Sequence, residues 1–414
     1  MPVAPYSLDK QRSNICFAVA AAAIIASSIS LVRADDWPQW RGPKRDGISQ
    51  EKGWLTQWPD EGPKQLWQAD VGVGYSSFSV SEGRVYTMGN VEEKDYVYCL
   101  DANTGKEIWK YSYDCSSSDP NGYPGTRCTP TVDGNRVFTV SREGHLFCFR
   151  TPDGKEVWNK NYQKDFFAHV PTWGFSGSPL VEVNLLVVEP GARGASVVAL
   201  NKQNGNVVWK NGSDEPGYAS LMPYTYNNQR ALVVFSKDAV VGRTMAGGGE
   251  IWRFQWKTSF GVNASTPIVQ DDKVFVSSGY NYGSALLQTS VRPPKVLWQN
   301  KKMRTHVSSC VLWENNIYGF DDDALECLDF QTGEVKWSTK TFGKGSLMIA
   351  DGKLIIYSDN GRLALAEASP AGFKQIASAQ VLGGKSTWSV PVLANGKIYC
   401  RSLEKMVCLD VKGQ

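Results

Sequence analysis

A tryptophan that stands four residues after a turn residue recurs along most of this chain. Successive tryptophan positions lie 42, 49, 51, 43, 46, 39 and 39 residues apart. In the first and sixth units the turn residue is proline, and in the last unit isoleucine replaces the tryptophan. A period of this size with strand-like segments between the anchors predicts the blades of a β-propeller. The anchors in chain order are Pro63/Trp67, Gly105/Trp109, Gly154/Trp158, Gly205/Trp209, Gly248/Trp252, Pro294/Trp298, Gly333/Trp337 and Gly372/Ile376.

The repeat decides the domain organisation of the 414 residues, because each unit is too small to bury a core without its neighbours. The 12% aromatic content and 39 glycines suit many short strands joined by turns. The net charge is only +3, and basic and acidic residues are interspersed. The composition therefore gives no electrostatic reason to expect a nucleic acid or an anionic membrane surface as a partner.

Residues 1–34 read as a signal peptide. Lys10 and Arg12 precede an apolar run over residues 15–31, and Val32-Arg33-Ala34 has the small residues that a signal peptidase recognises. We expect cleavage after Ala34, and a periplasmic or secreted protein with no membrane span. The alternative is an uncleaved anchor, but the run is short for a bilayer and is interrupted by serines.

The segments between the anchors predict an all-β, eight-bladed propeller of four-stranded blades over residues 63–414. Residues 35–62, rich in tryptophan and proline, predict an extended arm packed on it. The eighth unit ends where its outer strand should begin, so the segment at Leu66-Trp67 is expected to supply that strand and close the ring. Inner strands are predicted near Phe78, Thr131, Leu180, Tyr224, Ile268, Val311, Leu347 and Val392.

Four of the nine cysteines occupy one position of the repeat, where the third unit has Ala199. Alternation of alanine and cysteine there predicts a small, buried strand position. Cys115 and Cys128 flank a polar loop and are a candidate disulfide in an oxidising compartment. Cys400 and Cys408 are a weaker candidate pair. The four repeat cysteines are Cys99, Cys148, Cys327 and Cys408.

No metal site is expected from residue spacing. The chain has no CxxC pair, and its three histidines, His145, His169 and His306, lack metal-ligand spacing. His145 falls on a third strand and is interpreted as structural. The run Asp321–Asp323 lies between two strands of one blade, where acidic turn residues are ordinary.

Ligands of a propeller meet the residues that enter the inner strands around the central channel. The tryptophans at these positions would stack on a planar ligand, while the two cations would bind carboxylates. No carboxylate occurs at these positions, and the alternative is a polar lining of a water-filled channel. The cofactor-binding candidates are Arg127, Trp173, Asn263, His306, Lys344 and Trp388, and the two remaining entry positions are Tyr75 and Tyr218.

Two loops, 114–127 and 165–175, are longer than blade turns require. Long loops on a rigid ring often carry function. If exposed, Phe166, Phe167 and Trp173 in the second loop would suit partner or ligand binding; the alternative is that they cap neighbouring blades.

The repeat resembles a known family motif. Asp101-Ala102-Asn103-Thr104-Gly105-Lys106-Glu107-Ile108-Trp109, and again Gln331-Thr332-Gly333-Glu334-Val335-Lys336-Trp337, resemble the tryptophan-docking motif of the pyrroloquinoline-quinone (PQQ) repeat superfamily. The resemblance covers about residue 60 to the end. The segment Asp36-Trp37-Pro38-Gln39-Trp40-Arg41-Gly42-Pro43 is similar to the mature start of secreted bacterial members.

The resemblance implies two classes of function. Some members are quinoprotein alcohol dehydrogenases, which hold PQQ and calcium over the channel, and another is the propeller lipoprotein of the outer-membrane assembly machinery. This chain lacks a lipid-bearing cysteine after the signal and the adjacent cysteine pair of many dehydrogenases. Our first hypothesis is a monomeric scaffold that binds a protein or carbohydrate; the second is a PQQ-dependent oxidoreductase for an alcohol or sugar. The sequence leaves open which is right.

Overall fold

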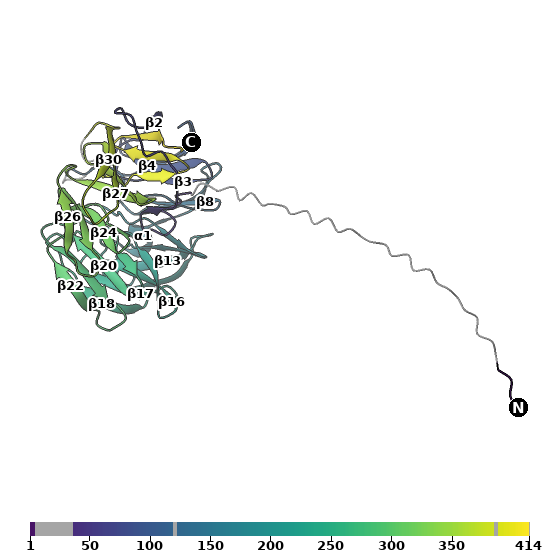
Figure 1. Ribbon diagram of the computed structural model, residues 1–414. Coiled ribbons are helices and arrows are strands. Elements are labelled where there is room, and N and C mark those ends of the chain that lie inside the picture. The colour runs from purple at the N-terminus through teal and green to yellow at the C-terminus, as the bar shows by residue number, and fades with distance from the viewer. Residues whose placement is uncertain (5–35, 119–121, 385–387, 414) are drawn as a thin grey trace. The chain divides into compact units, whose positions relative to one another are not determined.

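The computed structural model describes residues 1–4, 36–118, 122–384 and 388–413. The predicted signal-peptide cleavage site lies outside the described residues. Among the helices of these ranges, none has both the length and the apolar character needed to cross a membrane. From Ala34 onward the chain is one compact unit, and its strands form eight sheets arranged as a propeller (Figure 1).

The first four blades follow one another in chain order. Blade 1 contains β3 (Ser79–Ser81), β4 (Arg84–Val91), β5 (Lys94–Asp101) and β6 (Glu107–Asp114). Blade 2 contains β7 (Thr131–Asp133), β8 (Arg136–Val140), β9 (His145–Arg150) and β10 (Glu156–Asn161). Blade 3 contains β11 (Leu180–Glu182), β12 (Leu185–Val188), β13 (Val197–Asn201) and β14 (Val207–Asn211). Blade 4 contains β15 (Met222–Tyr226), β16 (Gln229–Phe235), β17 (Ala239–Thr244) and β18 (Glu250–Gln255).

The last four blades complete the ring. Blade 5 contains β19 (Ile268–Gln270), β20 (Lys273–Ser278), β21 (Gly283–Gln288) and β22 (Lys295–Asn300). Blade 6 contains β23 (Val311–Trp313), β24 (Asn316–Asp321), β25 (Ala324–Asp329) and β26 (Val335–Thr339). Blade 7 contains β27 (Gly345–Ala350), β28 (Lys353–Ser358), β29 (Arg362–Glu367) and β30 (Gln375–Gln380). Blade 8 contains β31 (Val392–Ala394), β32 (Lys397–Arg401) and β33 (Lys405–Asp410).

An N-terminal strand closes the ring, as the sequence predicted. Strand β2 (Gln65–Asp70) pairs antiparallel with β33, and the sheet order is β2-β33-β32-β31. Trp67 lies opposite Cys408 in this pairing. The exposed edges of an open first and last blade are thereby removed. The prediction of eight four-stranded blades is confirmed.

The recurring tryptophans join each blade to the next. Trp109 at the outer strand of blade 1 lies against Gly154 of blade 2, and its indole Nε1 donates a hydrogen bond of 2.8 Å to the carbonyl of Thr151. The same pair of contacts recurs at Trp67, Trp158, Trp209 and Trp298, whereas Trp337 keeps only the hydrogen bond, because a Cβ added to Gly372 would meet no atom within 4 Å. Indole-to-carbonyl bonds join Trp67 to Ala102, Trp158 to Lys202, Trp209 to Met245, Trp298 to Phe330 and Trp337 to Ser369.

Trp252 departs from this pattern because the next blade has no glycine turn to receive it. Blade 5 carries Pro293-Pro294 at the equivalent turn. The Trp252 indole instead donates to the hydroxyl of Tyr224 in its own blade, at 2.8 Å. The contact with the neighbouring blade depends on a turn residue without a side chain.

The repeated small position lies beneath these tryptophans. Cys99 pairs with Trp109, Cys148 with Trp158 and Cys408 with Trp67, each on the third strand beside an outer-strand bulge. Their thiols are fully buried and free. At the same position of blade 4, a Cβ added to Gly242 would lie 2.3 Å from the ring of Trp252. A small residue lies under the indole in these blades, as the sequence indicated, but blade 5 is an exception, because Leu286 lies opposite Trp298.

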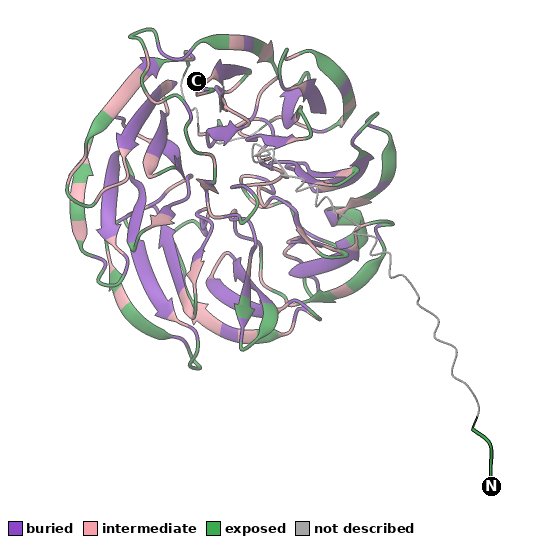
Figure 2. Cartoon of the chain, turned by 45° about the vertical axis from the view of Figure 1, so that its right-hand side comes forward, coloured by how far each residue is buried: buried purple, intermediate pink, exposed green. Residues whose placement is uncertain are grey.

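Apolar side chains fill the space between neighbouring blades. One cluster joins Phe138 and Cys148 of blade 2 to Leu186 and Val198 of blade 3. Figure 2 shows burial along the inner three strands of the blades and exposure along the outermost strand. Outer strand β14 is accordingly mostly exposed, whereas β24 is entirely buried.

The segment from Trp37 to Glu51 crosses the inside of the ring. Its main chain begins beside blade 1, where the amide of Trp37 donates to the carbonyl of Val80 at 2.8 Å. It then adds β1 (Ile48–Ser49) as a parallel strand to β27 of blade 7. Further hydrogen bonds connect the segment to Val132 of blade 2, Ser178 and Pro179 before blade 3, Thr266 before blade 5, Cys310 before blade 6 and Gly396 of blade 8.

Two buried arginines fix this segment. Arg45 is 1% exposed and donates to the carbonyls of Pro179 at 3.0 Å and Ser178 at 3.1 Å. Arg41 is 3% exposed and donates to the carbonyl of Cys310 at 2.6 Å. Burial lowers the pKa of both guanidinium groups, to about 10 for Arg41 and about 9 for Arg45. Removing either side chain would leave buried carbonyls without a donor.

We predict that Gly154→Ala destabilises the propeller through the tryptophan contact. Gly154 has φ +67°, and a Cβ there would meet the Trp109 ring at 2.6 Å. We expect a loss of about 2–4 kcal/mol in the free energy of unfolding, from left-handed backbone strain and overpacking. The control Gly134→Ala has φ +54° but no atom within 4 Å, and should lose only about 1–2 kcal/mol. If chemical denaturation gave both variants the same loss of unfolding free energy, the contact between Gly154 and Trp109 would not be the cause.

We predict that Arg45→Ala detaches the arm from blade 3. The Ser178 carbonyl would become a buried acceptor without a donor, while the Pro179 carbonyl would keep only the hydroxyl of Thr131, at a cost of about 1–3 kcal/mol in unfolding free energy. The neighbouring Lys44 is exposed, and Lys44→Ala should change stability by less than about 0.5 kcal/mol. Limited proteolysis of the arm reports the detachment. Equal protease resistance of the two variants would show that Arg45 does not hold the arm.

Candidate functional site

A cavity of about 160 Å³ lies where the chain enters the inner strands. Aromatic side chains supply much of its wall: four come from the entry positions before blades 1, 3, 4 and 8, and others from the arm, from the loop before blade 2 and from a turn of blade 5. The lining residues that matter below are Trp40, Tyr75, Tyr123, Arg127, Trp173, Tyr218, Tyr280, His306 and Trp388, with Ser176, Ser178 and Ser220 between them.

Six of the eight predicted entry positions line this cavity. Four of them are cofactor-binding candidates, namely Arg127, Trp173, His306 and Trp388. They converge because equivalent positions of successive blades surround one axis. Their role in binding stays a prediction.

Asn263 does not line the cavity. Its side chain is fully buried, and its amide donates to the carbonyls of Ser236 at 2.8 Å and Lys237 at 3.0 Å. The amide oxygen accepts a hydrogen bond of 2.8 Å from the hydroxyl of Ser278. The nitrogen and the oxygen of the Asn263 amide are therefore both used in hydrogen bonds that join blade 4 to blade 5. The role of this side chain is structural.

Lys344 also lies outside the cavity wall, but it acts on a residue within it. Its ammonium contacts Nδ1 of His306 at 3.4 Å and pairs with Asp322 at 3.0 Å. Burial, and then the Lys344 charge, lower the pKa of His306 from its ordinary value of 6.5. The cavity therefore presents a neutral imidazole at pH 7. Tyr280 stands edge-on to this imidazole, with ring centroids 4.6 Å apart.

The aromatic wall is ordered by ring contacts. Tyr75 stacks on Trp388 with centroids 5.3 Å apart and 20° between planes, and Tyr123 contacts the same tryptophan at 5.3 Å. Across the cavity, Trp173 meets Tyr218 edge-on at 5.7 Å. Such pairs hold large flat faces in place without strain.

Polar groups are few on this wall. The guanidinium of Arg127 lies 5.7 Å from the centre of the Tyr75 ring, and donates to the carbonyls of Gly125 and Tyr123. The indole Nε1 of Trp388 is buried and has no hydrogen-bond partner among the described residues. An indole N–H is a donor only, so it is suited to a ligand oxygen.

The rule for entry positions did not predict three aromatic residues of the cavity wall. Trp40 comes from the arm, and its Nε1 is held by the hydroxyl of Thr266 at 2.9 Å. Tyr123 lies in the loop before blade 2, and Tyr280 in the turn between β20 and β21. The entry-position rule covers inner strands only, so it has no signal for an arm, a loop or a second turn.

The second long loop gives a mixed outcome. It begins inside helix α1 (Tyr162–Phe166), which Asn161 caps by accepting hydrogen bonds from the amides of Gln163 and Lys164. Phe166 is 3% exposed and packs on Tyr162, so the packed alternative applies to it and the exposed one does not. The helix turns it inward, while Phe167 at the helix end is 81% exposed.

The structure also bears on the prediction for the acidic run Asp321–Asp323. The three consecutive aspartates pair separately, Asp321 with Arg304, Asp322 with Lys344 and Asp323 with Lys340, as acidic turn residues do.

The candidate disulfide partners Cys115 and Cys128 are both free thiols in the structure. Cys128 points to the carbonyl of Thr129, whereas Cys115 lies beside Asp95. The weaker pair, Cys400 and Cys408, is also free, because the two residues lie on adjacent strands but out of register, with Cys408 opposite Tyr399.

The lining residues do not fit a PQQ–calcium centre. Calcium takes six to eight oxygen ligands, usually including carboxylates, and alcohol oxidation requires a base. None of the described lining residues is an aspartate or glutamate. Arg127 and the stacked rings would suit an acidic planar molecule, but the wall supplies no ligand set for its metal.

Comparison with known proteins identifies the family. A family model described as outer membrane protein assembly factor BamB matches residues 52–120 and 116–339, which is more than half of the chain. The chain belongs to this family of PQQ-like repeat propellers. The expected superfamily is thus confirmed.

Proteins similar to this chain have different named functions. Tetrathionate hydrolase of Acidithiobacillus ferrooxidans is 22% identical over 88% of this chain and 80% of its own. BamB from Moraxella catarrhalis superposes with a TM-score of 0.61 at 12% identity, covering 85% of this chain and 98% of its own. Quinohemoprotein alcohol dehydrogenase ADHIIG from Pseudomonas putida HK5 gives 0.64 at 12% identity, covering 92% and 81%. The structural likenesses show the fold alone.

We predict that Lys344→Met raises the pKa of His306. Removing the ammonium leaves Asp322, which favours the imidazolium, while burial still opposes it. The pKa of His306 in the folded protein lies below 6.5, so His306 contributes stability that is fully present above pH 6.5 and is lost as the pH falls through the folded pKa. This loss of stability at low pH should be smaller in the variant. NMR titration of the histidine ring protons measures the shift. Lys340→Met, on the neighbouring exposed turn, is the control, and equal titration in both variants would contradict the contact.

Proposed function

We propose that this protein is an exported, non-catalytic binding propeller of the cell envelope whose aromatic cavity binds a carbohydrate ring. The observation that supports it most is the composition of the cavity wall. Seven tyrosine and tryptophan side chains surround about 160 Å³, with Arg127 and His306 beside them and no carboxylate among the described lining residues.

The wall chemistry favours an uncharged ring of the size of one sugar residue. Aromatic faces pack against the C–H faces of a sugar, while a few placed donors fix its hydroxyl groups. The buried indole N–H of Trp388 and the neutral imidazole of His306 are such groups. A flat protein surface would not reach into a cavity whose wall includes Trp40 of the arm.

The family and the predicted signal peptide also support the proposed binding role and export. BamB is described as an outer membrane protein assembly factor, which is a binding rather than a catalytic role. The signal peptide predicted over residues 1–34 agrees with a place in the cell envelope. Because the outermost strands of the blades are exposed, a protein partner bound there is compatible with a sugar in the cavity.

The purified protein tests this proposal by tryptophan fluorescence and calorimetry with a panel of mono- and oligosaccharides. We expect a saturable change with at least one sugar, and at least a tenfold weaker affinity in Trp388→Ala, since that ring stacks in the wall and carries the free donor. Val183→Ala is the control, because Val183 is 78% exposed and is absent from the cavity lining. Absence of binding to every sugar would overturn the ligand class.

The competing activities are tested on the same preparation. Calcium-dependent binding of PQQ together with dye-linked alcohol oxidation would replace the proposal with a quinoprotein oxidoreductase. Turnover of tetrathionate would replace it with the activity named for the Acidithiobacillus relative. We expect neither, because the described cavity wall lacks a carboxylate to serve as metal ligand or base.

A further inference from the structure

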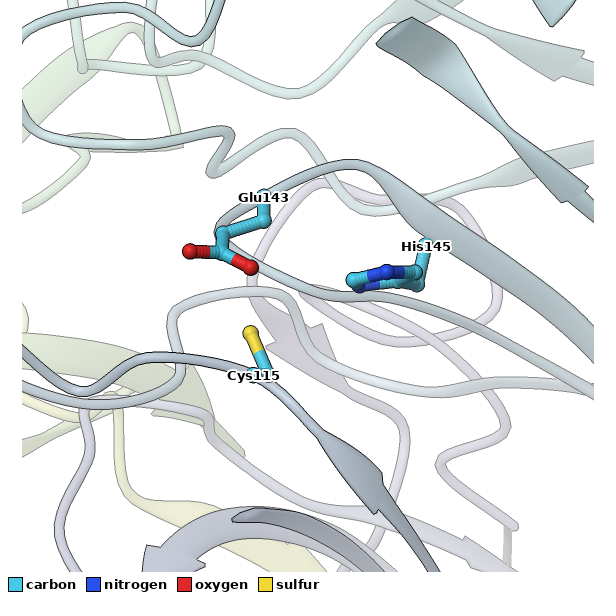
Figure 3. Close-up of side chains that lie close together, drawn as sticks. All are labelled: Cys115, Glu143 and His145. Atoms are coloured by element: carbon cyan, nitrogen blue, oxygen red, sulfur yellow. The ribbon is translucent and has the colours of Figure 1, made fainter. Parts of the chain in front are cut away.

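A group of metal-ligand side chains lies between blades 1 and 2, apart from the cavity wall. Cys115, Glu143 and His145 place a sulfur, a carboxylate oxygen and a ring nitrogen within 4.8 Å of one another. Figure 3 shows the Glu143 carboxylate and the Cys115 sulfur facing each other, with the His145 ring beside them. These three donor types together are a typical zinc ligand set.

Three separate elements supply these residues. Cys115 directly follows β6, the outer strand of blade 1. Glu143 lies in the turn between β8 and β9, and His145 is the first residue of β9 in blade 2. Only the packing of two blades brings them together, which explains why ligand spacing in the sequence gave no signal.

The positions of the donors are fixed by neighbouring hydrogen bonds. The Ser141 hydroxyl contacts Nδ1 of His145 at 3.0 Å and also receives the amide of His145 at 2.9 Å. On the other side, Asn90 donates to the carbonyl of Cys115 at 2.9 Å and to Asp95 at 2.7 Å. Partners that orient ligand residues in this way are a regular feature of metal sites.

Negative charge at this place lacks a counterion. Within the described part of the chain, no hydrogen bond or ion pair engages the Glu143 carboxylate, although its backbone is bonded. Asp95, which is fully buried, adds a second carboxylate beside the Cys115 thiol. Two carboxylates near one thiol are stabilised by a cation among them.

We propose that Cys115, Glu143 and His145 bind one divalent ion of the zinc class. Zinc–ligand bonds of the usual length place tetrahedral donor atoms about 3.3–3.6 Å apart, so the group must contract. Glu143 allows this, because it lies in a turn and is only half-buried. Three protein ligands leave a fourth position for water.

The ion would join two blades where the first long loop begins. That loop starts at Cys115 and ends at Arg127, and it brings Tyr123 and Arg127 to the cavity wall. Binding at Cys115 therefore anchors the root of a loop that shapes the cavity. The inference is independent of which ligand the cavity takes.

The test uses the full-length purified protein, stripped with a chelator and titrated with zinc against a chromophoric competitor. We expect one ion per chain and a rise in melting temperature with zinc. Cobalt in place of zinc should give a thiolate-to-metal charge-transfer band. Zinc affinity should fall at least tenfold in Cys115→Ser, in His145→Ala and in Glu143→Gln.

Matched variants separate ligation from folding. Cys148→Ser removes a buried blade-2 thiol outside the group, and His169→Ala removes an exposed histidine; both should keep zinc binding. Glu143→Gln alters a turn side chain and should fold as the parent does, so it decides the matter if Cys115→Ser does not fold. Full zinc binding in Glu143→Gln, or a cobalt complex without the charge-transfer band, would overturn the proposal, as would absence of zinc binding.

Discussion

The contact between one blade's tryptophan and the next blade's turn holds this propeller together. An indole lies flat on a glycine with positive φ and donates to a carbonyl of the same turn, as Trp109 does at Gly154 and Thr151. The contact requires a residue without a side chain at the turn, as the 2.6 Å approach of a Cβ on Gly154 to the Trp109 ring shows. Where the turn has prolines, as before Trp298, the preceding Trp252 turns back to Tyr224 in its own blade. The sequence repeat and the packing of neighbouring blades both reflect this geometry.

The arm decides what the inside of the ring offers to a ligand. Arg41 and Arg45 are buried, and their guanidinium groups donate hydrogen bonds to carbonyls at the starts of inner strands. The arm thereby brings Trp40 into the cavity wall. A segment outside the repeat thus supplies part of the proposed binding site, and variants of the arm and of the cavity are expected to be coupled.

The cavity and the inter-blade group have different chemistry, although one loop connects them. The cavity is aromatic and has few polar groups, whereas the group at Cys115, Glu143 and His145 is rich in charge and soft donors. The likeness in fold to both BamB and an alcohol dehydrogenase does not choose between a binding and an oxidising role. The choice rests on the side chains that this chain presents, above all on the absence of a carboxylate from the described cavity wall.

The sequence by itself determined the fold, because each local signal agreed with the others. The tryptophan period, the strand alternation and the unpaired segment at Trp67 predict eight blades and their closure. It also placed Arg127, Trp173, His306 and Trp388 at the channel, since position in a repeat implies position in space. Only the tertiary structure showed that Asn263 faces backbone carbonyls, that Phe166 turns inward and that Cys115 meets His145. A side chain's direction and its partners from other blades depend on packing between segments far apart in the chain, and no periodicity records that packing.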